Sequence, residues 1–429
     1  MLMGKLALTG GPKAVRLDRR KFAVPPVSEE AIAAVVELMR KGETSISPSV
    51  AEFEREFADY VGCEYGLALT SGTAALQTAL FAVGVEPGDE VIVPSFTFLT
   101  TATTVPAMGG VTIFADVDRD TMTLDPTDIE RKITERTRAI VVCHVWGNPA
   151  DMESILKLAR PRGIAVIEDC SHAHGATWQG KKVGSVGDVG CFSCQGSKLV
   201  AAGEGGVLTT NDRDLYERAI VLGRPEKRAE IREDSWIKRF AFTGLGFKYR
   251  PHPLGIAIAR EQLHHLDEMN EIRDRNGAVL DAGLADVADV VPQRVLPGCR
   301  RVYNSHCMRY DPDRLGGVSV ETFLQALSAE GVSIGRMRYG HLHGNPIFTE
   351  GFPYGTKGAT LSAQGHDASN FSNGPLPVTE HLREYAFRAA PRLETECREL
   401  INQYLDAYHK VASAVDELLT YEKEHRSEA

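Results

Sequence analysis

Long hydrophobic runs are missing from this sequence. No stretch of its 429 residues approaches the roughly 18 consecutive apolar residues that indicate a membrane-spanning helix. The first residues contain only a short apolar patch, interrupted by Gly and basic residues, which is not typical of a signal peptide. Positive charge is not in excess either, because 48 Lys and Arg stand against 58 Asp and Glu, a formal net charge of −10. This excess of negative charge argues against a protein built mainly to bind nucleic acid. Because long apolar runs are missing as well, we expect a cytoplasmic protein with no membrane contact.

The sequence also lacks the motifs of several common sites. Its eight cysteines lie mostly in apolar, strand-like runs, which indicates reduced thiols and not disulfides. The CxxC pair Cys191 and Cys194 has no second ligand pair, and His172 and His174 have no HxxxH partner, so we expect no metal. No GxxxxGK(S/T) motif is present, which excludes an ATP-type phosphate loop.

Short β-branched runs alternate with helical patterns from about residue 60 to 210. This alternation is typical of βαβ units, and it predicts an α/β fold with a mainly parallel central sheet flanked by helices. Such a sheet binds ligands at the carboxyl ends of its strands. The predicted strands are Glu90–Pro94, Val111–Ala115, Ala139–Val145, Ile164–Glu168, Gly190–Ser193 and Gly206–Thr210, and the predicted helices include Ala74–Val83 and Met152–Ala159.

Beyond the sheet, Pro253–Asn276 is expected to form one long helix, followed by a smaller C-terminal α/β domain. A loop rich in small and polar residues covers about 352–375, and a loop of that length is usually functional or mobile. The predicted domains are an N-terminal arm at 1–30, a large domain at 31–260 and a small domain at 261–429.

Two segments place reactive side chains after predicted strands. One strand runs into Ser193, and Lys198 follows in a glycine-rich setting. A desolvated lysine can form a Schiff base with a carbonyl, although most lysines only solvate a surface. Another strand leads to Asp169, whose carboxylate can keep a pyridinium nitrogen protonated or can simply cap the next helix.

Two further segments add an anion site and an aromatic ring. The run LTSGTAAL opens a helix with Ser71, Gly72 and Thr73, whose free amides and hydroxyls can hold an anion or serve as a simple helix cap. The run PSFTFLTT places Phe96 and Phe98 at a strand end, where one ring can stack on a flat ligand or pack in the core. An anion cradle, an aromatic ring, a carboxylate and a Schiff-base lysine are together the parts that a pyridoxal 5′-phosphate (PLP) enzyme requires.

The order of these motifs resembles the DegT/StrS family, whose members are PLP-dependent sugar aminotransferases of fold type I. The resemblance extends over nearly the whole chain. The matching segments are SGT at 71–73, PSFTF at 94–98, EDCSHAHGA at 168–176, SCQGSK at 193–198, GEGG at 203–206, GFKYRPHPLGIAIAREQL at 246–263 and LPVTEHL at 376–382.

The resemblance implies a role for each matching residue. Lys198 stands at the position of the Schiff-base lysine, and Asp169 at that of the partner of the pyridine nitrogen. Phe98 matches the aromatic residue that stacks on the ring, and His172 falls where most relatives carry a Gln that contacts the ring region. The residues that match phosphate contacts are Gly72, Thr73 and Ser193.

The GFKYR segment departs from the family pattern. Lys248 stands where many members have an Asn that reaches the phosphate from the neighbouring subunit, and Arg250 matches a nearby Arg. A lysine would supply a full positive charge, which suits a dianion. The resemblance therefore implies a homodimer with shared active sites.

The implied activity is amino transfer from an amino acid to a keto group of a sugar or cyclitol, as in amino sugar or aminocyclitol antibiotic biosynthesis. It would follow a ping-pong mechanism through an internal aldimine at Lys198, with pyridoxamine 5′-phosphate as intermediate. The run around SCQGSK resembles the cyclitol and aminohydroxybenzoate branches, which favours L-glutamine over L-glutamate as donor. Candidates for the acceptor cleft are residues 303–306, His341, His343, Asn345 and the 352–375 loop.

Two alternatives belong to the same fold. In a sugar dehydratase a His replaces the lysine, so Lys198 argues against that activity. A non-catalytic ligand sensor has no need of a proton shuttle, so the complete set Asp169, Ser193 and Lys198 disfavours it.

Overall fold

The computed structural model describes residues 4–23, 27–287, 290–337, 339, 341–349 and 374–425. Its largest sheet has seven strands in the order β1-β9-β8-β5-β4-β2-β3. The pairs from β8 through β5, β4 and β2 to β3 are parallel, whereas β9 is antiparallel to both of its neighbours. The strands are β1 (Tyr65–Leu69), β2 (Glu90–Pro94), β3 (Val111–Ala115), β4 (Thr137–Cys143), β5 (Ala165–Asp169), β8 (Val189–Ser193) and β9 (Gly206–Thr210).

This arrangement confirms the predicted α/β fold with a mainly parallel sheet. The predicted bounds of β2, β3 and β9 agree with the structure, and those of β4, β5 and β8 differ by only one or two residues at an end. All five residues of β2 are buried, as expected for a strand covered on both faces.

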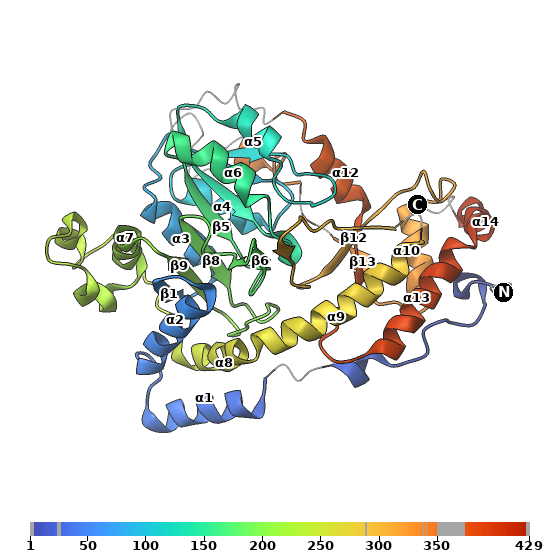
Figure 1. Ribbon diagram of the computed structural model, residues 1–429, viewed down its shortest axis with the longest axis horizontal. Coiled ribbons are helices and arrows are strands. Elements are labelled where there is room, and N and C mark those ends of the chain that lie inside the picture. Colours follow the sequence, from blue (N-terminus) through green and yellow to red (C-terminus); the bar gives the residue numbers. More distant parts are fainter. Residues whose placement is uncertain are drawn as a thin grey trace.

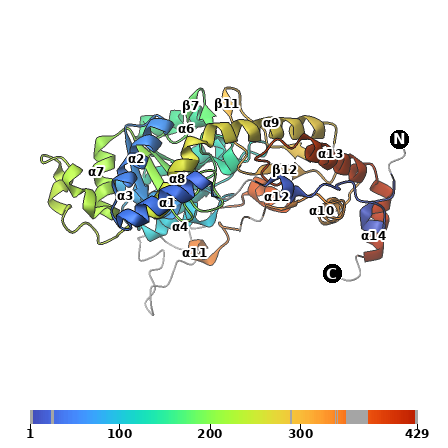
Figure 2. The ribbon, with the colours of Figure 1, turned by 90° about the horizontal axis from the view of Figure 1, so that it is seen from below.

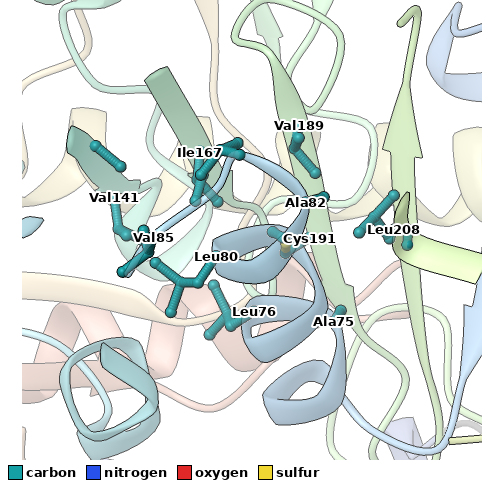
Figure 3. Close-up of a cluster of buried hydrophobic side chains, with 14 of the residues drawn as sticks. Ala75, Leu76, Leu80, Ala82, Val85, Val141, Ile167, Val189, Cys191 and Leu208 are labelled. Atoms are coloured by element: carbon teal, nitrogen blue, oxygen red, sulfur yellow. The ribbon is translucent and has the colours of Figure 1, made fainter. Parts of the chain in front are cut away.

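Helices cover both faces of the sheet (Figure 1). On one face, Leu76 and Leu80 of α3 pack against strand residues that include Val141 and Ile167 (Figure 3). The neighbouring strand residues Ile140, Val142 and Val166 point the other way and join a separate core with α5 and α6. The helices of this part are α1 (Glu29–Lys41), α2 (Pro48–Val61), α3 (Gly72–Ala82), α4 (Leu99–Ala107), α5 (Pro126–Lys132), α6 (Met152–Ala159), α7 (Arg213–Gly223) and α8 (Pro253–His264).

A second, four-stranded antiparallel sheet has the order β10-β12-β14-β13. Its core also includes Leu6 and Val15 from the start of the chain, so the N-terminal segment packs against the C-terminal half. Figures 1 and 2 place both chain ends at this end of the molecule. The elements are β10 (Val290–Pro292), β12 (His306–Tyr310), β13 (Gly335–Arg336), β14 (Ala386–Ala390), α9 (Leu266–Leu284), α10 (Val320–Ala329), α12 (Pro377–Tyr385), α13 (Arg398–Ala412) and α14 (Val415–His425). The short helix α11 (Pro346–Thr349) instead packs Phe348 into the core of the large sheet.

Short elements complete the fold. A three-stranded sheet has the order β11-β6-β7. These strands are β6 (Thr177–Trp178), β7 (Lys181–Lys182) and β11 (Cys299–Arg300), and the 3-10 helices are Ala7–Thr9, Arg19–Phe22, Val145–Gly147, Arg160–Arg162, Pro225–Glu230 and Trp236–Phe240.

The prediction of one helix over Pro253–Asn276 is wrong, because two helices meet at His265. His265 has φ −99° and ψ 0°, which interrupts the regular helix. The two helices serve different cores: Ile256 and Ala259 of α8 pack beside the large sheet, whereas Leu280 and Leu284 of α9 belong to the core of the second sheet. The chain therefore changes direction where it passes from one core to the other.

Within the described ranges, no helix is long and apolar enough to cross a membrane. All eight cysteines are free, and all except the half-buried Cys299 are buried. The predicted domain bounds at residues 30 and 260 stay a prediction.

Candidate active site

The carboxyl ends of three parallel strands meet at one edge of the large sheet. Asp169 at the end of β5 stands opposite Cys143 of β4 and Cys191 of β8. After Ser193 ends β8, the chain turns toward Lys198, whose backbone N–H donates to the carbonyl oxygen of Gln195 at 2.8 Å. Ligands bind at this edge in open α/β sheets.

Asp169 is held in place by two hydrogen-bond donors. Thr101 Oγ1 donates to Asp169 Oδ2 at 2.7 Å, and the backbone N–H of Ser171 donates to Oδ1 at 3.1 Å. Only 4% of Asp169 is exposed. The two bonds fix the direction in which the remaining lone pairs of the carboxylate point.

Gly72 allows the first turn of α3 to lie against the end of β8. A Cβ atom on Gly72 would lie only 2.7 Å from Ser193 Cβ, so no other residue fits without a shift. Ser71 caps the helix by accepting a hydrogen bond from the N–H of Ala74 at 3.0 Å. Because first-turn amides have no partner within the helix, the region around Gly72, Thr73 and Ser193 is suited to an anion.

His172 offers an uncharged hydrogen-bond donor at this edge. The backbone N–H of Trp146 donates to His172 Nδ1 at 3.3 Å, so a neutral ring carries its proton on Nε2. Burial lowers the pKa of His172 well below its usual range, and nearby Lys198 lowers it further. A Gln side chain at this position would likewise offer an uncharged N–H.

Lys198 is half-buried and lies near Asp169. Burial lowers the pKa of the Lys198 ammonium, while Asp169 acts in the opposite direction. Among the described side chains, none accepts a hydrogen bond from Lys198 Nζ. A cavity of about 330 Å³ adjoins this lysine, and its other lining residues include Gln262, Met269, Arg273, Arg392 and Glu394.

The structure distinguishes the two aromatic candidates. Phe96 is 1% exposed and packs edge-on against Trp146 and Tyr339, so it belongs to the core. Phe98 is 52% exposed and immediately precedes α4, the helix that carries Thr101. Phe98 is therefore the ring that remains available to a ligand.

Sequence reasoning missed Thr101, which positions Asp169, and His144, which positions the neighbouring Glu168. Thr101 is an ordinary helical Thr in the sequence, and only the fold brings its hydroxyl to Asp169. His144 donates through Nε2 to Glu168 at 3.0 Å, because its Nδ1 already accepts from the N–H of Ala150 at 3.1 Å. The buried His144–Glu168 pair ties the end of β4 to the end of β5.

Within the described residues, no hydrogen bond or ion pair joins the other predicted site residues to Asp169 or Lys198. Lys248 is exposed and Arg250 half-exposed, and no ion pair joins either to another described residue. Tyr303 and His306 both bind Asp281, at 2.9 and 2.7 Å. Residues 352–373 of the predicted acceptor loop lie outside the described residues.

Buried His174 gives the protein an acid sensitivity that can be measured. Burial lowers its pKa to about 3, with a smaller contribution from Lys198. Below the unfolded value of about 6.5 the unfolded chain takes up a proton that the folded chain does not, so stability falls as the pH falls from about 6.5 toward 3. Between pH 7.5 and 5.5 the free energy of unfolding, measured in urea, should therefore fall by about 1 kcal/mol less in His174→Leu than in the wild type. An unchanged loss would contradict this assignment.

Comparison with known proteins identifies the relatives of this chain. The model of the DegT/DnrJ/EryC1/StrS aminotransferase family matches residues 25–373. An L-glutamine:scyllo-inosose aminotransferase of Streptomyces griseus is 33% identical over 426 residues, which covers 96% of this chain and 99% of the relative. An L-glutamine:2-deoxy-scyllo-inosose aminotransferase of Streptomyces lividus is 38% identical over 338 residues, which covers 76% of this chain and 78% of the relative.

Solved structures agree with this relationship. DesV of S. venezuelae, solved in complex with a ketimine intermediate, is 27% identical with a TM-score of 0.76, covering 94% of this chain and 99% of that one. The 3-amino-5-hydroxybenzoic acid synthase is 28% identical with a TM-score of 0.73, covering 92% of this chain and 98% of that one. These findings confirm the resemblance drawn from the motifs: the chain belongs to the DegT/DnrJ/EryC1/StrS aminotransferase family.

Proposed function

We propose that this aminotransferase binds PLP at Lys198 and moves the amino group of L-glutamine to the keto group of a cyclitol. The observation that carries the proposal is the arrangement at one sheet edge: a lysine with no ion-pair partner among the described residues, a fixed carboxylate and a helix start that requires a glycine. L-Glutamate and a ketosugar are the nearest variants of donor and acceptor.

The residues present fit the chemistry of PLP. The close approach of Gly72 to Ser193 leaves a small polar region at a helix start, as a phosphate needs. Asp169 is buried and held by Thr101, as a partner of a pyridinium nitrogen needs to be. The exposed ring of Phe98 and the N–H donor of His172 would contact the cofactor ring and its substituents.

Each residue then has a defined task. Bound PLP supplies an electron sink that makes the proton on Cα of the amino donor removable. Asp169 keeps the proton on the pyridine nitrogen in both halves of the reaction. Lys198 Nζ would hold the cofactor between turnovers, move the Cα proton of the donor to the cofactor in the first half-reaction, and move a proton from the cofactor to the acceptor carbon in the second. Because burial lowers the pKa of Lys198, its amine is more easily available as a neutral base.

The names of the relatives favour glutamine and a cyclitol. The Streptomyces relatives act, by their names, on L-glutamine with scyllo-inosose or 2-deoxy-scyllo-inosose. The match to the S. griseus protein extends over almost both full lengths. The dehydratase and sensor alternatives are not favoured, because Lys198 is present and several relatives, among them the S. griseus protein, are named as aminotransferases.

A donor and acceptor screen tests the proposal. The purified enzyme would be incubated with glutamine, glutamate or alanine against ketoinositols, ketohexoses and nucleotide-linked ketosugars, and the amine product would be measured. We expect turnover with glutamine and a ketoinositol. Turnover only with nucleotide-linked ketosugars would overturn the cyclitol assignment while leaving amino transfer intact.

The working unit is proposed to be a homodimer. The segment that leads to Lys248 protrudes from the end of the molecule beyond α7 (Figures 1 and 2). Five large apolar side chains are exposed on this segment. A cluster of exposed apolar side chains marks an interaction surface, and a second copy seated there would receive Lys248. These side chains are Trp236, Phe240, Phe242, Leu245 and Phe247.

Lys248→Ala should weaken cofactor retention. A charge-assisted contact with the phosphate is worth about 1.5–3 kcal/mol, so PLP affinity should fall by about 10-fold to 150-fold. Dialysis against increasing PLP, followed by absorbance, measures the affinity. Lys423→Ala, which changes an exposed lysine on α14, should leave it unaltered. Equal affinity in both variants would remove Lys248 from the site.

A further inference from the structure

Three side chains outside the cofactor site converge on one point. His341 and His343 precede α11, and Glu380 lies in α12. His341 Nε2 is 2.8 Å and His343 Nε2 is 2.9 Å from Glu380 Oε1, and the two ring nitrogens are 3.0 Å apart. Every pair among these three atoms is thus at hydrogen-bond distance.

With Glu380 ionised, no distribution of protons satisfies all three contacts. If both Nε2 atoms carry hydrogen and donate to Glu380, the two N–H groups face each other across 3.0 Å. If one Nε2 lacks hydrogen, its lone pair faces a carboxylate lone pair at less than 3 Å. A cation at the centre resolves the conflict, because it attracts all three lone pairs at once.

The other His and carboxylate cluster behaves differently. His144, Glu168 and Cys170 also lie together, and all three are buried. There Ala150 N–H donates to His144 Nδ1, and His144 Nε2 donates to Glu168. The second oxygen of Glu168 accepts from the backbone, so that cluster needs no cation.

Two neighbouring side chains fix the positions of His343 and Glu380 in this cluster. Ser95, immediately after β2, contacts His343 Nδ1 at 2.7 Å, which leaves Nε2 directed at the cluster. Asp116 accepts hydrogen bonds from the first-turn amides of α12 at Val378 and Thr379, which fixes the helix that carries Glu380. Such supporting contacts orient metal-binding histidines in known sites.

We propose that His341, His343 and Glu380 bind one divalent transition-metal ion such as Zn²⁺. Two imidazoles and a carboxylate are ligands that this class of ion prefers. Three donors about 2.9 Å apart and about 2.0–2.1 Å from an ion subtend about 90°, which leaves room for water on the open side. The ion would fasten the segment before α11 to α12, beside the end of β2.

This site departs from the expectation of no metal drawn from the sequence. His341 and His343 have no HxxxH spacing, and Glu380 lies on a separate helix, so nothing in the motif pattern joins them. Only the fold completes the set. The proposal does not depend on the identity of the amino donor or acceptor.

Zinc binding by the purified full-length holoenzyme tests this site. The protein would be treated with chelator, loaded with Zn²⁺, passed through gel filtration and analysed for zinc, with affinity measured by competition with a chromophoric chelator. His341→Ala and Glu380→Gln remove one ligand each. His381→Ala is the matched control, because it removes the neighbouring imidazole on α12 that lies outside the cluster.

Wild type and His381→Ala should retain about one zinc per chain, and the two ligand variants should bind it at least about 100-fold more weakly. Zinc should also raise the unfolding temperature of the wild type and not that of Glu380→Gln. Absence of retained zinc in the wild type, or equal zinc in all four proteins, would overturn the proposal. Glu380→Gln keeps the side-chain size, so its unchanged cofactor absorbance shows that lost binding is not lost folding.

Discussion

Replacing Lys198 by alanine is expected to lower amino transfer by at least about 10³-fold, because the variant loses both the covalent anchor and the group that moves the Cα proton. The lysine lies at the sheet edge near Asp169, and in the described chain no other side chain holds its amine. The visible absorbance band at about 400 nm, which is expected from a cofactor bonded to the lysine, should disappear as well. Steady-state turnover with glutamine and a ketoinositol measures the first effect, and absorbance the second.

The control for this change is Lys181→Ala, which removes an exposed lysine from β7. It should keep both turnover and the band. Added methylamine should restore part of the activity of Lys198→Ala, because a small free amine can move the proton but cannot repair a misfolded chain. A Lys198→Ala enzyme with wild-type turnover would contradict the assignment.

Asp169→Asn is expected to lower turnover by about 10²-fold to 10⁴-fold, the range for a group that controls a catalytic proton. The change keeps the size of the side chain but removes the charge that holds a proton on the pyridine nitrogen. Because Asp169 is only 4% exposed, water cannot easily replace that charge. Single-turnover reaction with glutamine isolates the affected half-reaction.

Thr101→Val provides a graded comparison with Asp169→Asn. It removes the 2.7 Å hydrogen bond to Asp169 but leaves the carboxylate charged. We expect a loss of about tenfold, the lower end of the value of one hydrogen bond to a charged group, because the carboxylate keeps its charge and its second donor. If Asp169→Asn were no slower than Thr101→Val, the charge of Asp169 would not be what the reaction uses.

Much of the fold follows from local sequence patterns. The runs that form β2, β3 and β9 are short and rich in β-branched or apolar residues, so their bounds agree with the prediction. The break at His265 could not be predicted, because nothing in the local pattern of Pro253–Asn276 distinguishes one helix from two. It depends on which core each half contacts.

Some residues of the site could likewise be predicted from the sequence, and others could not. Residues in compact motifs, such as Asp169 and Lys198, could be selected from the sequence because their neighbours carry a pattern. Thr101 and His144 could not, because their roles depend on contacts across the sheet edge. The role of Lys248 in binding the phosphate stays a prediction, because the phosphate that it would contact belongs to a cofactor bound in a second subunit.

The central claim is that the α-amino group of glutamine reaches a cyclitol. The most direct test supplies L-glutamine labelled with ¹⁵N either at the α-amino group or at the side-chain amide, together with scyllo-inosose, and analyses the aminocyclitol by mass spectrometry. The account predicts ¹⁵N in the product only from the α-labelled donor. Label from the amide, or no aminated cyclitol from any donor, would contradict it.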